Sequence, residues 1–252
     1  MEFFIYGSEP PKINFSQSPN GSFSFVIENK NKVRYFKENV RGKSLSWCDI
    51  HPMVQEIPGF IKDYDSFEEL LNNPKCPEKS IAFKALNYEF NRITSHFAQF
   101  TESEAERNFF DYYIKDITEF EDPVWKWHKP VLIPQVWVNW LHYDSKDKNR
   151  KDRAQKEPFR VDFVMKDKEV GEEFIIIEID GESHFGKYLT KDNGGFILQP
   201  SMEEYTKHVR KDRWLRNQGW KVFRITALEI EKEADNFYYW FREVLGKPDV
   251  PF

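Results

Sequence analysis

Cysteine is scarce in this sequence, and apolar runs of membrane-spanning length are absent. The 252 residues include two cysteines, Cys48 and Cys76. Neither lies in a CxxC spacing or in a group of histidines, so neither a zinc finger nor a disulfide framework is indicated. This cysteine usage makes a reducing cytoplasm the expected compartment.

Secretory and membrane signals are also missing. The sequence opens with MEFFIYGSEPPK, which lacks the basic start, the apolar stretch and the cleavage site of a signal peptide. No run is long and apolar enough to predict a membrane-spanning helix, so no membrane partner is expected. The formal net charge of −5 argues against a protein that coats nucleic acid through bulk charge.

Positive charge is nevertheless concentrated locally. The run KDKNRKDRAQK (146–156), a predicted loop, contains six basic residues. A second basic stretch, 204–224, contains Lys207, Arg210, Lys211 and Arg213, some of which could reach phosphates of a nucleic-acid backbone. The alternative is that each run is a solvated face.

Residues 1–100 form an N-terminal region whose role the sequence does not identify. The runs FSFVIE and VRYF, separated by NKN, predict a short β-hairpin. Helices are expected from Asp65 through FEELL and over 79–97, where apolar residues recur at helical spacing.

Residues 101–252 form a second predicted domain. Ser103 followed by Glu106 is a capping box, which predicts a helix through ERNFFDYYIKDI. A strand is expected in VLIPQVWVNWLHY, and FRVDFVM (159–165) and FIIIEID (174–180) predict an antiparallel pair. The remaining predicted elements are a helix over about 202–217, the strand KVFRIT and a helix over 234–244. This order predicts a mixed α/β fold class.

The predicted strand pair separates an apolar face from an acidic one. Its odd-numbered positions are all apolar and predict the core face, whereas Asp162, Glu178 and Asp180 share the opposite face. A turn centred near Val170 would place Asp162 across from Glu178, with Cβ atoms roughly 5 Å apart. A slip of two residues would keep the same faces, so this register is a hypothesis.

Two opposed carboxylates require a proton, a basic partner or a cation between them. Of these, a divalent metal fits Asp162 and Glu178 best, because magnesium is typically held by one or two carboxylates together with phosphate oxygens of a substrate. Such a metal would activate water against a phosphodiester. The alternative is that Asp162 pairs with Arg160 and Glu178 only ends a strand.

Two further groups lie near these acids in the predicted fold. His184 follows the turn after Asp180 and either serves as a general acid or base, binds phosphate, or has a satisfied structural role. Asp212 falls on the apolar side of the predicted helix and needs a partner, for which Arg224 and His184 are candidates. Asp212 and Arg224 are then either structural or orient the site.

The runs RVDFVM, IIIEIDGESH and KDRWLRNQGWKVFRITALEI resemble the very-short-patch-repair-like endonuclease branch of the PD-(D/E)xK superfamily. Similarity extends upstream through SEAERNFFDYY and IPQV, over about residues 101–245. The resemblance implies a restriction-endonuclease-like core, with a mixed sheet flanked by helices, preceded by an additional N-terminal region.

This resemblance implies roles for individual residues. It makes Asp162 and Glu178 the acids that bind magnesium or manganese, and Glu106 the helical acid that completes the metal site. The capping box alone also explains Glu106. Gln135 lies in the strand that the family directs at its active site, where it could contact metal-bound water or substrate.

The family's motif lysine is replaced here by Asp180, as is usual in the branch with the EIDG..H form. The resemblance leaves the lysine's role to His184, to Lys211, or to a second metal held partly by Asp180.

The function predicted from these features is a magnesium-dependent endonuclease that hydrolyses DNA in restriction, phage defence or repair, as a homodimer or with partner proteins. A second interpretation is a catalytically inactive module that binds nucleic acid or protein on the same fold, although the clustered acids argue against it. A third is an RNA-cleaving toxin or effector.

Overall fold

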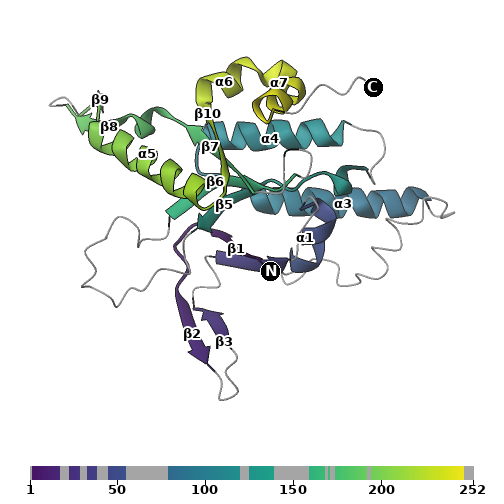
Figure 1. Ribbon diagram of the computed structural model, residues 1–252. Helices are drawn as coiled ribbons and strands as arrows, with labels where there is room; N and C mark the ends of the chain where they lie inside the picture. The colour runs from purple at the N-terminus through teal and green to yellow at the C-terminus, as the bar shows by residue number, and fades with distance from the viewer. Residues whose placement is uncertain are drawn as a thin grey trace.

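A computed structural model of the chain describes residues 2–17, 23–28, 33–38, 45–54, 79–119, 125–138, 159–167, 170, 174–191 and 194–246. Its elements surround one central sheet, with further strand pairs at the periphery (Figure 1). The predicted helix near Asp65 and the basic run 146–156 lie outside the described residues.

The central sheet has six strands in the order β10-β7-β6-β5-β1-β4. They are β1 (Glu2–Gly7), β4 (Val33–Glu38), β5 (Ile133–Val138), β6 (Phe159–Met165), β7 (Ile175–Asp180) and β10 (Lys221–Thr226). β10 runs parallel to β7, and the other neighbours are antiparallel. The mixed α/β fold class, with a sheet flanked by helices, is confirmed.

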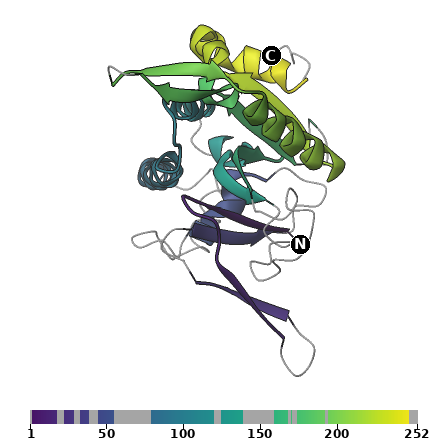
Figure 2. The same ribbon diagram turned by 90° about the vertical axis from the view of Figure 1, so that its left-hand side faces the viewer.

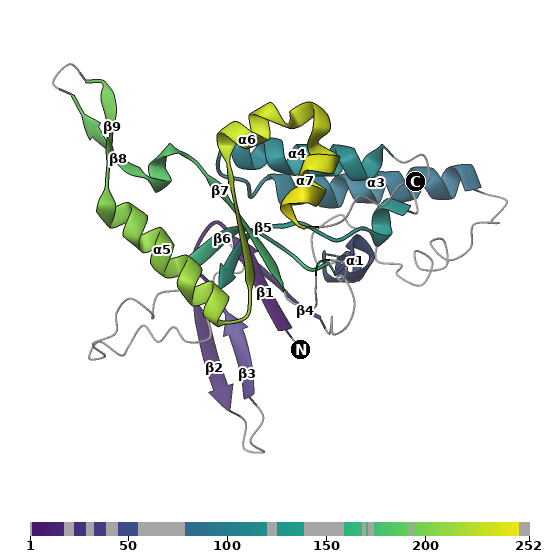
Figure 3. The same cartoon turned by 45° about the horizontal axis from the view of Figure 1, so that its top comes forward.

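Helices cover both faces of this sheet. They are α1 (Trp47–Val54), α3 (Lys79–Ala98), α4 (Glu104–Thr118), α5 (Met202–Asn217), α6 (Ala227–Lys232) and α7 (Phe237–Val244), with 3-10 turns η1 (Trp125–His128), η4 (Glu182–His184) and η5 (Ala234–Asn236). Figure 3 shows α5 on one side of the sheet and α3 and α4 on the other. Within the described part of the chain, no helix has the length and apolar character needed to cross a membrane.

The main core lies between the sheet and α4. Phe163 of β6 is fully buried, and its ring centroid lies 5.4 Å from that of Phe109 and 6.3 Å from that of Phe110. Both partners come from the apolar stripe of α4, which the sequence predicts from the spacing of its aromatic residues. Burial of these large rings supplies hydrophobic stabilisation that fixes α4 on the face of the sheet opposite the acids.

The predicted register of β6 and β7 is observed. Phe163 pairs with Ile177 and Met165 with Ile175, a register whose continuation places Asp162 opposite Glu178. Alternation along each strand therefore directs the apolar side chains toward α4 and the acids toward α5.

The predicted N-terminal hairpin is wrong in its pairing. Both runs form strands, but β3 (Phe23–Ile27) pairs with β2 (Ile13–Gln17), and β4 pairs with β1. Figure 2 shows the β2–β3 pair extending away from the central sheet. Alternation of apolar and polar residues predicts that a run is a strand, but it does not predict which strand it joins. Because β1 pairs with β5, β1 and β4 belong to the same sheet as the acids.

Candidate functional site

Asp162 and Glu178 are the centre of a cluster that also includes Gln135, Lys211 and, from the first turn of α4, Glu106. This group is here called the carboxylate cluster. Lys211 reaches it from α5, and its Nζ lies 2.7 Å from Glu178 Oε1 and 2.8 Å from Oε2. The same ammonium donates a hydrogen bond of 2.7 Å to the Arg160 carbonyl oxygen. Lys211 therefore gives the buried Glu178 carboxylate its compensating charge.

Glu106 belongs to the cluster and also caps α4. Ser103 is the N-cap, and its Oγ accepts the Glu106 N–H at 3.1 Å. Glu106 Oε2 accepts the Glu102 N–H at 3.0 Å and a 2.5 Å bond from Gln135 Nε2. The predicted capping box is formed in part, because Ser103 caps α4 as expected while the Glu106 side chain binds the Glu102 N–H instead of the Ser103 N–H. Glu106 also contacts Gln135, the strand residue that the family resemblance placed near the site.

Gln135 has an unusual backbone. Its φ is +53°, and no other non-glycine residue among those described has a positive φ. The β5–β6 pairs on either side of it, Pro134 with Phe163 and Val136 with Val161, frame the position opposite Asp162. The left-handed conformation of a buried glutamine costs free energy, which the hydrogen bond to Glu106 helps to offset.

Asp162 has a pKa well above that of a free aspartate. Its Oδ2 accepts the backbone N–H of Ile179 at 2.7 Å. Burial raises the pKa of Asp162 to about 7, and the Glu178 carboxylate adds to this effect, whereas Lys211 opposes it. Near neutral pH a proton on Asp162 therefore relieves much of the repulsion within the carboxylate cluster.

A second cluster is centred on Arg224 of β10 and is here called the arginine network. Arg224 Nε donates to Asp180 Oδ2 at 2.8 Å, its Nη2 also contacts Asp180, and its Nη1 donates to Asp212 Oδ1 at 2.8 Å. His184 Nδ1 lies 2.6 Å from Asp180 Oδ1, and the His184 ring stacks on His208 with centroids 4.3 Å apart. The predicted Arg224 partner of Asp212 is thus observed.

The arginine network fixes the charge of its members. Burial alone would raise the pKa of Asp180, but hydrogen bonds from His184 and Arg224 outweigh burial and lower this pKa to about 2. Burial, followed by the neighbouring charges of His184 and Arg224, lowers the pKa of His208 to about 4. At neutral pH Asp180 is therefore an anion and His208 is neutral, which suits a structural joint between β7, α5 and β10.

The other predicted basic residues lie on the surface of α5. Lys207 pairs with Glu204 at 3.0 Å. Arg210, Arg213 and Arg216 are exposed and make no hydrogen bond or ion pair among the described residues. These three guanidinium groups are therefore available to an anionic partner, whereas Lys211 is directed into the carboxylate cluster.

The sequence analysis offered a proton, a basic partner or a metal as compensation for Asp162 and Glu178. The structure supplies the first two through the raised pKa of Asp162 and the ammonium of Lys211. Arg160 pairs with Glu102 rather than with Asp162. Among described residues, no group of three or more His, Cys, Asp or Glu side chains is arranged to hold a metal ion. Magnesium or manganese binding stays a prediction.

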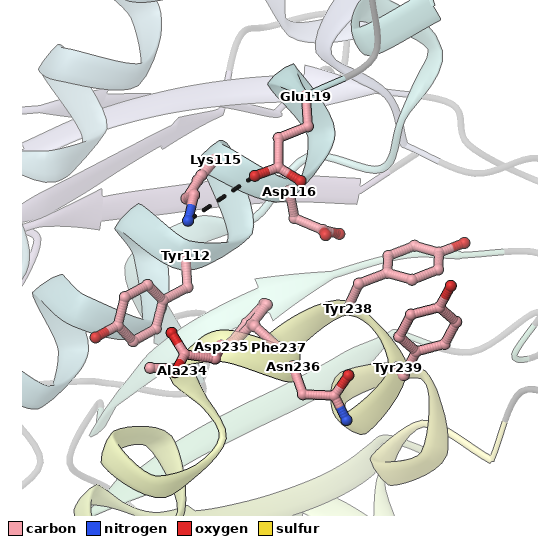
Figure 4. A pocket seen from close by; sticks show the side chains of 10 residues that line it. All are labelled: Tyr112, Lys115, Asp116, Glu119, Ala234, Asp235, Asn236, Phe237, Tyr238 and Tyr239. Carbon is pink, nitrogen blue, oxygen red and sulfur yellow. Dashed lines mark ion pairs between the residues drawn. The ribbon is translucent and has the colours of Figure 1, made fainter.

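A pocket of about 150 Å³ lies apart from both clusters, between α4 and the segment from η5 to α7. Figure 4 shows Tyr238 and Tyr239 on one side of the pocket and Asp116 and Glu119 on the other, and Lys115 pairs with Glu119 at 3.8 Å. Burial, followed by repulsion from Glu119, raises the pKa of Asp116 to about 7. None of the residues that the sequence analysis selected lines this pocket.

Sequence reasoning missed the hairpin of β8 (Gly186–Thr190) and β9 (Phe196–Pro200) that precedes α5. Its signal was present, because the β-type runs KYLT and FILQ flank an Asn-Gly pair, a frequent turn sequence. Gly194, in this turn region, has a φ of +80°.

Comparison with known families finds a RAP domain over residues 177–237, and the RAP domain is an RNA-binding domain. The match runs from β7 through the β8–β9 hairpin, α5, β10 and α6 to the first residue of α7. No curated protein matches the chain, and no solved structure does.

The RAP match overturns the resemblance to very-short-patch-repair-like endonucleases. It covers EIDGESH and KDRWLRNQGWKVFRIT, two of the runs on which that resemblance depended. The predicted function as a metal-dependent DNA endonuclease is therefore wrong, and the nucleic acid indicated is RNA. The endonuclease prediction took the opposed acids as a sign of a metal site. Two acids on adjacent strands are equally stable where a lysine and a proton compensate their charges.

Arg224 is predicted to be important for stability. Arg224→Ala leaves Asp180 and Asp212 without their shared cation, so we expect the free energy of unfolding to fall by roughly 2 to 3 kcal/mol. Arg224→Lys should recover less than half of this loss, because lysine cannot bridge two carboxylates with a planar fork. Urea unfolding measures both variants, with the exposed Arg213→Ala as control. A loss no larger than that of the control would contradict the prediction.

Asp162 should make stability depend on pH. The folded protein binds a proton at Asp162 up to about pH 7, whereas an unfolded aspartate releases it near pH 4. Stability contributed by this group therefore falls as pH rises from about 4 to about 7. Asp162→Asn removes this dependence and keeps an acceptor for Ile179, so its melting temperature relative to wild type should rise more at pH 8 than at pH 4.5. Exposed Asp235→Asn is the control, and an equal shift at both pH values would refute the assignment.

Proposed function

We propose that this chain binds RNA through the segment over residues 177–237. The observation that carries this proposal is the RAP domain match, which includes the whole of α5 and β10. RNA binding also agrees with the second interpretation of the sequence, in which the chain is a module that binds nucleic acid on an α/β fold. Cytoplasmic location is part of the proposal, since the two cysteines suggest no oxidising compartment.

The exposed side of α5 is the proposed contact to the RNA backbone. Arg210, Arg213 and Arg216 recur every third residue, so they follow one another around the exposed side of the helix. Guanidinium groups bind phosphate oxygens through two parallel hydrogen bonds, and an exposed arginine without an internal partner loses no ion pair on binding.

The inward side of α5 supports this arrangement. Lys211 and Asp212 are bound to Glu178 and Arg224, which fixes the rotation of the helix about its own axis. A fixed helix presents its arginines at defined positions, so fewer degrees of freedom are lost when RNA binds. Since the net charge of the chain is −5, attraction to RNA depends on this local surface rather than on overall charge.

RNA binding alone accounts for the RAP match, and no hydrolysis of RNA is needed to explain it. Hydrolytic activity stays a prediction, and a denaturing gel of the RNA after each binding assay, with magnesium or with EDTA, tests it alongside.

The proposal predicts a defined effect of α5 arginines on RNA binding. Arg210→Ala/Arg213→Ala should weaken the affinity for RNA about tenfold in moderate salt, because two phosphate contacts are lost. The slope of log affinity against log salt concentration should fall by about 1.4 for a single-stranded probe. Fluorescence anisotropy with a labelled RNA measures both quantities.

The matched control removes two exposed cations from the other side of the sheet. Arg107→Ala/Lys115→Ala, on α4, lowers the net charge equally and should leave affinity and salt slope unchanged. If both double variants weaken binding alike, the attraction is bulk charge and the α5 surface is not the contact. If wild type binds no RNA, the proposed function itself is wrong.

A further inference from the structure

The β8–β9 hairpin exposes large apolar side chains on both of its faces. Tyr188 is 55% exposed, Leu189 44%, Phe196 69% and Ile197 50%. Most exposed apolar side chains of a soluble protein are scattered singly, whereas a contiguous group marks a surface that contacts a partner. A two-stranded ribbon is also marginally stable when uncovered, so a partner on this hairpin would stabilise it.

Two aromatic rings share one face of the ribbon. Tyr188 pairs with Leu198, and Thr190 pairs with Phe196. Because directly opposed residues share a face and alternate residues return to it, Tyr188 and Phe196 lie on the same face as diagonal neighbours. Two exposed rings on one face of paired strands are the arrangement on which unpaired bases stack.

The hairpin is continuous with the arginine surface of α5. β9 ends at Pro200, and α5 begins at Met202, with the Ser201 N–H bonded to the Phe185 carbonyl oxygen at 2.9 Å. Figure 3 shows the hairpin projecting from the N-terminal end of α5, beyond the sheet. An RNA strand whose phosphates lie along α5 can therefore extend to the ribbon.

Charge at the junction is compatible with RNA. Glu203 and Glu204 lie there, but Lys187 Nζ lies 2.6 Å from Glu203 and 3.5 Å from Glu204, and Lys207 also pairs with Glu204. The two lysines compensate these two carboxylates, whereas Glu182 accepts a hydrogen bond of 3.2 Å from the Tyr188 hydroxyl group at the edge of the ring, which leaves the face of the ring accessible to a base. The aromatic surface lies at the start of a helix that carries unpaired arginines about two turns further on, which favours a nucleic acid over an apolar protein partner.

We propose that Tyr188 and Phe196 form a stacking platform for bases of single-stranded RNA whose backbone contacts α5. This inference deepens the proposed function and depends on it. Base pairing in a duplex hides the faces of bases from such a platform, so the protein should prefer unpaired RNA, with little sequence preference.

The test compares Tyr188→Ala/Phe196→Ala with wild type on three labelled RNAs. These are a single strand of about 12 nucleotides, its duplex, and an equally long strand with abasic sites. We expect the variant to bind the single strand at least tenfold more weakly, with affinities for the duplex and the abasic strand and the salt slope all unchanged. Quenching of a 2-aminopurine base on binding should be lost in the variant and retained in Tyr188→Phe.

The control variant Tyr88→Ala/Tyr239→Ala removes two exposed tyrosines on α3 and α7 and should bind like wild type. Failure of the two proposals is distinguishable. If RNA binding depends on the α5 arginines but not on Tyr188 and Phe196, the platform is wrong and the proposed function stands. If instead the variant abolishes a dimer seen by sedimentation while RNA affinity is unchanged, the ribbon binds a second copy, and the stacking proposal is overturned.

Discussion

The attachment of α5 to the sheet combines apolar packing with two ion pairs. Leu215 is fully buried and Trp214 packs against the core, while Lys211 pairs with Glu178 and Asp212 with Arg224. Ion pairs are directional, whereas apolar contacts tolerate rotation and sliding. The acids of β7 therefore determine which side of α5 faces inward, and by exclusion which side exposes Arg210 and Arg213.

Charge compensation also accounts for the rest of the acidic face. Glu178 has the Lys211 ammonium, Asp180 has Arg224 and His184, and Asp162 has a proton near neutral pH. Each of these partners lowers the free energy needed to bury a carboxylate. Glu178 and Asp180 both lie in the part of β7 that the RAP match covers, so their partners join the sheet to the segment proposed to bind RNA. Gln135 has strained backbone in the same place, and its bond to Glu106 ties β5 to the N-terminus of α4.

Patterns within short stretches of sequence predicted the features that depend on neighbouring residues alone. The bounds of α5 follow from its caps, the faces of β6 and β7 from alternation, and the Asp212–Arg224 contact from the need to pair a half-buried charge. The register of β6 with β7 depended in addition on the assumed position of the turn near Val170. The N-terminal pairing could not be predicted, because β4 joins β1 and β3 joins β2 through choices among strands of similar composition. The β8–β9 hairpin was predictable from the Asn-Gly sequence between its two strands, whereas the direction of Lys211 toward Glu178 required the position of α5 in three dimensions.

The endonuclease interpretation failed at a step that sequence alone could not test. Opposed acids on neighbouring strands are consistent with a metal site, but they are equally consistent with a lysine that enters from another element. Lys211 lies 33 positions from Glu178 in the chain, so no local pattern reveals their contact, and the family resemblance offered Lys211 only as one of three substitutes for the motif lysine. Once that contact is made, the acids serve to hold a helix, and the helix in turn carries arginines that face outward. The RNA contact proposed here would then use the charges that remain unpaired on the surface after the buried acids have taken their partners.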